Sequence, residues 1–364
     1  MYTYSHGGNA AFESGHEHIT DLSANINPLG IPDKVRDAII GDIANIVSYP
    51  DNSNRKLREK ISEFEKVNPE WLFCGNGASD IIFRLPRVVQ AKKVLITAPT
   101  FSDYERSAMS YGSAIVYYPM SPDSAFTLDK DFVETAEREQ PDLIYICNPN
   151  NPTGKLTNTD IIKDLLDLGL NNKMMIAVDE CFLEFTEFAD EYTSKVFLKD
   201  YSNLIIFKAF TKLFTMPGIR LGYAICSNGK IIDSLFFHGP DWPVSNLAQA
   251  AGIAALDNAD EFVRKTIEYV FAERSKIEYQ LSDLGYKTFG STANYVFLQS
   301  PFPFDLQEEL NKEGIRIRSC SNYHNLDKSY YRIAVSTKEN NMKMLEAINK
   351  ITIEQKARKV VKES

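Results

Sequence analysis

The sequence predicts an α/β protein, with a mainly parallel sheet in a large domain and a second, smaller α+β domain. Between residues 71 and 226, short apolar runs of β type alternate with helical patterns. Apolar strands that alternate with helices are typical of a parallel sheet with helices on both faces. After Trp242, one long helical stretch precedes further β-type runs, which indicates the second domain.

A seven-stranded sheet is expected in the large domain, with helical stretches such as 159–168 between its strands. Its predicted strands are 71–74, 94–97, 115–118, 143–147, 174–178, 204–207 and 223–226. The smaller domain is expected to contain a long connecting helix, three strands, a last helix and a charged, frayed tail. These elements are predicted at 248–284, at 295–298, 315–318 and 331–335, at 339–351 and at 355–364.

Three parts of the chain follow from this pattern. Residues 1–47 are expected to form an irregular arm and a helix, which begins at Pro32 and belongs to the small domain. Residues 48–240 form the large, ligand-binding domain, and residues 241–364 form the small C-terminal domain with its connecting helix.

Composition excludes several classes of protein. The chain has 364 residues and a net charge of -9, which argues against a nucleic-acid partner bound by bulk electrostatics. No apolar run approaches the roughly 18 residues of a membrane helix, and the start lacks the basic and apolar regions of a secretory signal. Five cysteines without a Cys-x-x-Cys pair fit free thiols in a reducing cytoplasm, so we expect a cytoplasmic protein and no metal site.

Polar clusters follow four of the predicted strands. They lie at 75–79, at 148–154, at 179–180 and at Lys212, the last with Arg220 eight residues further on. Ligands bind at the carboxyl ends of the strands in an open α/β sheet, so these clusters predict one site.

One end of this site suits a phosphate group. Gly77, Ala78 and Ser79 open a helical pattern, where backbone N–H groups and a hydroxyl can bind an anion. Arg220 supplies a positive charge for the same anion.

The other end suits an aromatic aldehyde. Asp179 could keep a ring nitrogen protonated, Asn151 could donate to a ring oxygen, and Lys212 could form an imine with an aldehyde. Together with the phosphate site, these side chains describe a site for pyridoxal 5'-phosphate, whose ring is an electron sink while its nitrogen stays protonated.

The chain resembles the fold-type I pyridoxal-phosphate enzymes of the aspartate aminotransferase superfamily over nearly its whole length. The run 151–154 (Asn-Pro-Thr-Gly), then Asp179, Lys212 and Arg220, has the order and spacing of that family. The resemblance implies the family's fold and its cofactor. It implies that Lys212 is the lysine that binds the cofactor aldehyde, and that Asp179 pairs with the pyridine nitrogen of the cofactor.

Further roles are implied by the same resemblance. Asn151 would contact the ring hydroxyl, and Phe101 matches the aromatic residue that stacks on the ring. Tyr49 matches a tyrosine that reaches the phosphate of the neighbouring subunit, which implies a homodimer with shared active sites. Arg332 matches the arginine that grips the substrate α-carboxylate.

Ala209 departs from the family pattern. This position, three before the lysine, is usually Ser or Thr and bonds the phosphate. The missing hydroxyl contact is worth roughly 1 kcal/mol. Thr211 or Lys208 is expected to compensate.

Several stretches resemble the L-threonine-O-3-phosphate decarboxylases of cobalamin biosynthesis, with histidinol-phosphate aminotransferases as the alternative. They are residues 6–9, 21–30, 179–182, 239–246 and 316–322. Phe182 favours the decarboxylases, because many aminotransferases carry there a tyrosine whose hydroxyl bonds the ring oxygen. The resemblance implies decarboxylation of L-threonine O-3-phosphate to (R)-1-aminopropan-2-yl phosphate.

Both alternatives take a phosphorylated substrate, so a second anion site is expected. Arg318 is the candidate for it, while His6 on the arm and Asn27 complete the predicted substrate contacts with Arg332. The substrate bond that stands perpendicular to the ring is the one that breaks. The same set of site residues can therefore support either decarboxylation or transamination.

Overall fold

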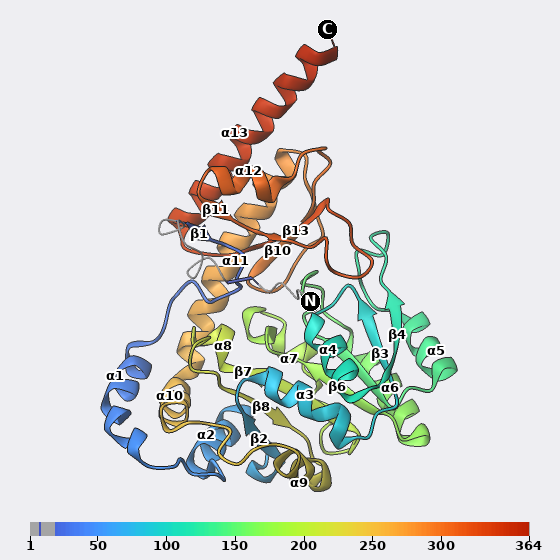
Figure 1. Cartoon of the computed structure of the whole chain (residues 1–364), viewed down its shortest axis with the longest axis vertical. Coiled ribbons are helices and arrows are strands. Elements are labelled where there is room, and N and C mark those ends of the chain that lie inside the picture. The colour runs from blue at the N-terminus through green and yellow to red at the C-terminus, as the bar shows by residue number, and fades with distance from the viewer. Residues whose placement is uncertain (1–6, 9–18, 364) are drawn as a thin grey trace.

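The computed structural model describes residues 7–8 and 19–363, and their strands form a large sheet, a smaller sheet and a separate two-stranded pair (Figure 1). The large sheet has seven strands in the order β2, β8, β7, β6, β5, β3 and β4. Within it, β8 alone runs antiparallel to its neighbours, so the prediction of a mainly parallel seven-stranded sheet is confirmed. The strands are β2 (Leu72–Gly75), β3 (Lys93–Ala98), β4 (Ala114–Pro119), β5 (Leu143–Cys147), β6 (Met175–Asp179), β7 (Leu204–Ala209) and β8 (Gly222–Ile225).

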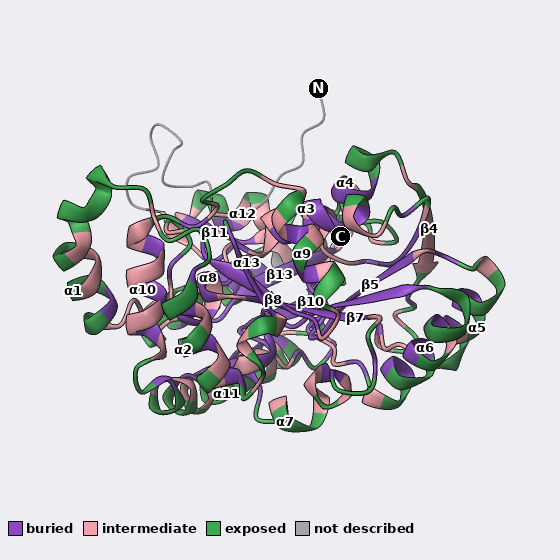
Figure 2. Cartoon of the chain, turned by 90° about the horizontal axis from the view of Figure 1, so that it is seen from below, coloured by how far each residue is buried: buried purple, intermediate pink, exposed green. Residues whose placement is uncertain are grey.

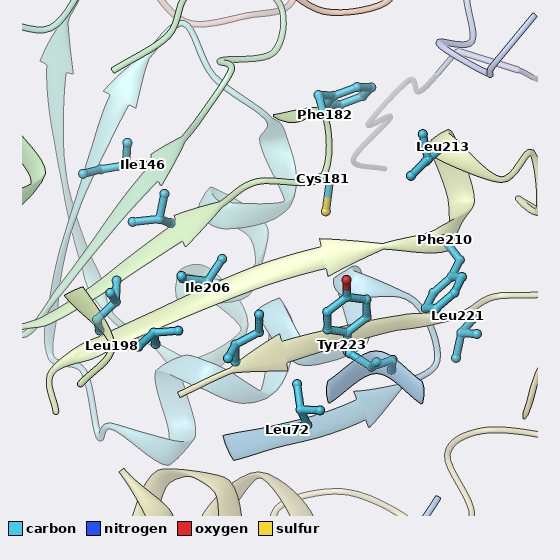
Figure 3. Packing of buried hydrophobic residues seen from close by; sticks show 14 of the residues in the cluster. Leu72, Ile146, Cys181, Phe182, Leu198, Ile206, Phe210, Leu213, Leu221 and Tyr223 are labelled. Carbon is cyan, nitrogen blue, oxygen red and sulfur yellow. The ribbon is translucent and has the colours of Figure 1, made fainter. Parts of the chain in front are cut away.

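Alternation along the strands divides the core into two layers. In β7, Leu204 and Ile206 belong to one apolar cluster, whereas Ile205 and Phe207 belong to the other. Figure 3 shows side chains of the first cluster, Ile206 among them, in the layer on one side of the sheet. Both faces are therefore buried, which explains why the strands read as continuous apolar runs.

Helices cover both faces, and in Figure 2 the buried strands lie inside a shell of helices whose outer sides are exposed. The first layer is covered by α2, α5, α6 and α10, and the second by α3, α4 and α9. The helices of this part are α1 (Asp33–Asp42), α2 (Arg55–Glu65), α3 (Ala78–Val88), α4 (Ser102–Tyr111), α5 (Lys130–Glu139), α6 (Thr159–Asn172), α7 (Ala189–Tyr192), α8 (Phe210–Leu213), α9 (Gly229–Phe237) and α10 (Asn246–Leu256). Short 3-10 turns are η2 (Ile43–Val47), η3 (Pro69–Trp71), η4 (Leu183–Phe185) and η5 (Ser194–Phe197).

The smaller sheet lies against α11 and α13 and has its own apolar cluster (Figure 1). Its order is β12, β13, β10 and β9, all antiparallel, while β1 and β11 pair separately in parallel. The elements are β1 (Thr20–Asp21), β9 (Lys287–Thr288), β10 (Tyr295–Gln299), β11 (Ile315–Arg316), β12 (Arg318–Ser319), β13 (Tyr330–Ala334), α11 (Ala259–Asp283), α12 (Leu306–Lys312) and α13 (Lys338–Glu363).

Two helix predictions were wrong. The predicted helix over 248–284 is interrupted between α10 and α11, where Asn258 takes a left-handed conformation with φ of 61°. The last helix does not end at 351 but continues to Glu363, so the charged tail extends α13. Periodicity alone missed the break because both helices are apolar on their inner sides.

The domain boundaries at 47 and 240 stay a prediction. Val35 of α1 and Ala248 of α10 share the apolar cluster of the large sheet.

Among the described residues, no helix combines the length and the apolar character needed to cross a membrane.

Candidate active site

A cavity of about 290 Å³ lies where the carboxyl ends of the large sheet's strands face the smaller sheet. This volume is at the lower end of the range of small-molecule sites. Ten predicted site residues line it: Ala78, Ser79, Phe101, Asn151, Asp179, Thr211, Lys212, Arg220, Arg318 and Arg332. The chain therefore brings together side chains that are up to 254 residues apart (from Ala78 to Arg332).

Asp179 is the last residue of β6 and is buried. Its Oδ2 accepts a hydrogen bond of 2.7 Å from the Tyr104 hydroxyl, and its Oδ1 accepts one of 3.0 Å from the Cys181 backbone N–H. Burial raises the pKa of Asp179 in spite of these two donors. A cationic partner would restore the charged carboxylate, as a protonated ring nitrogen does.

Lys212 lies in α8, one short turn beyond β7. Burial, together with the nearby charge of Arg332, lowers the pKa of its amine to about 8. Desolvation and a neighbouring cation both favour the neutral amine, which is the nucleophilic form that an imine requires. This environment suits covalent capture of an aldehyde.

The N-terminus of α3 forms a cradle for an anion. Gly77 has φ of +80°, and a Cβ there would lie 2.7 Å from Nη2 of Arg220, so the close approach requires glycine. Ala78 and Ser79 begin the helix and line the cavity, and their N–H groups are among the unpaired donors of its first turn. The Ser79 hydroxyl donates to Asp103 at 2.9 Å.

Lys208 and Thr211 were the two candidates to compensate for Ala209. Lys208 is buried in an ion pair with Glu180 at 3.2 Å and in another with Glu184. Thr211, in contrast, lines the cavity. Thr211 is therefore the hydroxyl that remains available beside Ala209.

Arg332, in β13, is buried at the floor of the cavity. Its Nη1 donates to Oδ1 of Asn151 at 2.5 Å, and its Nη2 donates to the Ser23 carbonyl at 2.7 Å. Its Nε is buried without a partner in the described part of the chain. A buried donor left unpaired costs free energy, and the positive charge of Arg332 at the cavity favours an anionic ligand. The amide oxygen of Asn151 is occupied, so its NH₂ group is the end that can donate to a ring oxygen.

Among the described residues, three predicted site residues, Gly77, Tyr49 and Asn27, do not line this cavity. Gly77 lies behind Arg220, as described above. His6 lies outside the described residues. Tyr49 is 79% exposed and stacks on Trp242, with ring centroids 4.4 Å apart. Asn27 is committed elsewhere, because its Nδ2 donates to the Leu213 carbonyl at 2.7 Å and to Thr266 at 2.8 Å.

The sequence analysis missed Asn25, two residues before Asn27. Asn25 is buried, lines the cavity, and leaves its Oδ1 without a partner among the described residues. The two asparagines share the same short motif, and only the fold shows which one faces the ligand. Asn25 therefore replaces Asn27 as the candidate substrate contact.

The wall and the mouth of the cavity complete the site. Phe182 is buried in the wall, packed edge-on against Tyr295 with ring centroids 5.4 Å apart. At the mouth, Nη2 of Arg318 donates to Oδ1 of Asn322 at 2.8 Å. Two arginines, Arg332 and Arg318, therefore lie in the same cavity, in addition to Arg220 beside the helix N-terminus.

The family model for class I and II aminotransferases matches residues 17–348. The chain belongs to this family. It is 35% identical, over 96% of its length and 94% of the relative, to a Caldanaerobacter subterraneus protein provisionally named threonine-phosphate decarboxylase. It is 29% identical, over 92% of its length and 90% of the relative, to the histidinol-phosphate aminotransferase of Methanococcus aeolicus. The structure of the histidinol-phosphate aminotransferase from Clostridium acetobutylicum has a TM-score of 0.85 and 31% identity, and covers 92% of this chain and 99% of that one.

Membership of this family makes pyridoxal 5'-phosphate the cofactor, and the residues present fit it. The glycine cradle and Arg220 suit its phosphate, while the buried Asp179 carboxylate suits a protonated ring nitrogen. The neutral amine of Lys212 suits its aldehyde.

The lowered pKa of Lys212 predicts how the cofactor-free protein captures pyridoxal 5'-phosphate. The amine reacts only when neutral, so the rate of covalent capture should rise with pH and level off above about 8. Stopped-flow absorbance measures this rate. Arg332→Leu removes a neighbouring cation and should move the midpoint to higher pH. A rate that keeps rising towards the ordinary lysine value near 10.5 would contradict the account.

Proposed function

We propose that this enzyme decarboxylates L-threonine O-3-phosphate to (R)-1-aminopropan-2-yl phosphate, a reaction of cobalamin biosynthesis. Two side chains of the cavity, Arg332 and Arg318, support a substrate with an anionic group at each end. L-threonine O-3-phosphate carries a carboxylate and a phosphate in one molecule.

Phe182 is the observation that carries the choice of decarboxylation. It lines the cavity as an apolar ring, three residues after Asp179, and has no hydroxyl to offer to a ring oxygen. Its sequence position is that of the tyrosine of many aminotransferases, so this contact is absent here. The 35% identity to a relative that bears the decarboxylase name adds support.

When bound, pyridoxal 5'-phosphate accepts the electron pair of the substrate bond that breaks at the α-carbon. Asp179 holds the proton on the pyridine nitrogen, which the family resemblance assigns to it. Arg332 binds the α-carboxylate, and Arg318 with Asn322 binds the distal phosphate. Two clamps at opposite ends would fix the rotation of the substrate, and so would decide which bond at its α-carbon is placed to break.

Lys212 completes the reaction. Its amine would hold the cofactor aldehyde in the absence of substrate and, once released, would carry a proton. After CO₂ leaves, Lys212 Nζ donates that proton to the substrate α-carbon. Thr211, Arg220 and the N-terminus of α3 hold the cofactor phosphate during this exchange.

A homodimer is part of the proposal. Ile40, Ile46 and Val47 lie in α1 and η2 with 63%, 61% and 87% of their surface exposed, next to the exposed Tyr49. An exposed apolar surface of this kind is typical of a subunit interface. Tyr49 does not reach the cavity of its own chain, in agreement with a contact to the cofactor phosphate of the partner.

A cytoplasmic location is supported by the five cysteines, all free thiols.

A two-substrate assay on the purified enzyme tests the reaction. One reaction contains L-threonine O-3-phosphate and is followed for CO₂, and the other contains L-histidinol phosphate with 2-oxoglutarate and is followed for glutamate. The proposal predicts CO₂ in the first and no glutamate in the second. Glutamate alone would instead make the chain a histidinol-phosphate aminotransferase, which the Methanococcus aeolicus relative keeps as the second candidate.

The mass in solution tests the dimer. Light scattering should give twice the 41.2 kDa of one chain. Val47→Glu should shift the mass towards one chain, because a buried unpaired carboxylate at an interface is costly. The same variant should bind pyridoxal 5'-phosphate more weakly, since it separates Tyr49 from the partner's cavity. Lys230→Glu in the exposed start of α9 is the matched control, and a Val47→Glu protein that stays dimeric would overturn this interface.

A further inference from the structure

A contact between two distant parts of the chain lies at the cavity wall. His324, in the loop after β12, places its Nε2 3.2 Å from Oε1 and 3.3 Å from Oε2 of Glu105 in α4. The Tyr117 hydroxyl in β4 donates to the same Glu105 Oε1 at 2.7 Å, and the Tyr117 and His324 rings lie 4.4 Å apart. All three side chains line the cavity.

A second contact fixes the same loop to the large sheet. Asn325, with φ of 66°, donates through its Nδ2 to the Met120 carbonyl at 2.6 Å and to the Ala98 carbonyl at 3.4 Å. These carbonyls lie at and just beyond the carboxyl ends of β3 and β4. The loop is therefore held at its far end by the large sheet, while its near end belongs to the small sheet.

Between these two ends lie the groups assigned to the distal phosphate. Arg318 precedes the loop, donates to Asn322 at 2.8 Å, and has its guanidinium 5.5 Å from the centre of the Tyr323 ring. Any movement of His324 is therefore passed to Asn322 and Arg318 through a few residues of backbone. Position matters here, because a two-pronged arginine contact depends on its geometry.

Charge matters as well. The Glu105 carboxylate is 18% exposed and faces the cavity that must admit a phosphate dianion. In the described part of the chain, His324 and Tyr117 are the donors to this carboxylate. Without His324, the carboxylate would lose one of these two donors and would repel the phosphate more strongly, since charges of like sign in a partly buried site are screened only weakly.

We propose that the contact between Glu105 and His324 positions Arg318 and Asn322 over the distal phosphate and keeps a hydrogen-bond donor on the Glu105 carboxylate, and so makes the enzyme select phosphorylated amino acids. This inference rests on the proposed function only in that the substrate carries a phosphate. It does not depend on which bond of the substrate breaks. Glu105 and His324 are thus positioning residues for specificity.

Binding to the complete holoenzyme tests the inference. O-phospho-L-threonine and L-threonine are titrated separately, and each Kd is read from the change in the visible spectrum of the bound cofactor. His324→Ala should raise the Kd for O-phospho-L-threonine roughly tenfold, whereas the Kd for L-threonine should stay within about twofold of the wild-type value. His238→Ala is the matched control, because the ring of His238 contacts the Ser234 carbonyl of its own helix at 2.9 Å.

A second substitution separates the inference from a general loss of structure. In the His324→Ala background, Glu105→Gln removes the uncompensated carboxylate and should restore part of the affinity for O-phospho-L-threonine. Turnover should show the same selectivity, with KM for the phosphorylated substrate raised and kcat within about twofold. Hydrogen exchange of the backbone amides in 320–326 should become faster in His324→Ala.

Three outcomes would overturn the inference. An equal loss of affinity for both ligands would show that the contact between Glu105 and His324 is purely structural. An unchanged Kd for O-phospho-L-threonine in His324→Ala would show that the contact has no role in binding. No recovery with Glu105→Gln would refute the charge argument. A wild-type enzyme that binds the two ligands equally would instead overturn the proposed phosphorylated substrate, which distinguishes the failure of the function from the failure of this inference.

Discussion

The buried carboxylate of Asp179 is the constraint on which the site depends. The large sheet places it at the end of a central strand, where the Tyr104 hydroxyl and the Cys181 N–H donate to it, and burial raises its pKa. A buried carboxylate is stable in its charged form when a cation pairs with it. The fold therefore creates a position that favours a protonated ring nitrogen, and Lys212, the N-terminus of α3 and the arginines lie around the same cavity.

A buried cluster of paired charges joins the ends of β6 and β7, next to Asp179. Glu180, directly after Asp179, pairs with Lys208, which lies four residues before Lys212. Burial opposes the charge of Lys208, but three surrounding carboxylates raise its pKa well above the ordinary value. Glu65 accepts from Lys195 and Tyr223 in the same cluster. Neighbouring residues thus have opposite tasks: Asp179 faces the ligand, whereas Glu180 and Lys208 fix the backbone that carries Asp179 and Lys212.

Much of the fold and of the cofactor site could be predicted from the sequence, because buried parallel strands are continuous apolar runs and the polar residues follow them directly. The break at Asn258 could not be predicted, because it lies between two helices of similar pattern. Asn25 lines the cavity and Asn27 does not. This difference could not be predicted, because the side chain of Asn27 is held by residues far away in the chain. The contact between Glu105 and His324 joins residues 219 apart, and no local pattern announces it.

The most direct measurement is the rate of the proposed decarboxylation in Asp179→Asn with pyridoxal 5'-phosphate bound. Asparagine keeps the shape of the side chain but lacks the charge that holds a proton on the ring nitrogen. The account predicts a protein that retains the visible band of the bound cofactor and loses at least about tenfold in rate, the effect of one charge-assisted hydrogen bond. An Asp179→Asn enzyme with bound cofactor and the wild-type rate would contradict the role of the buried carboxylate.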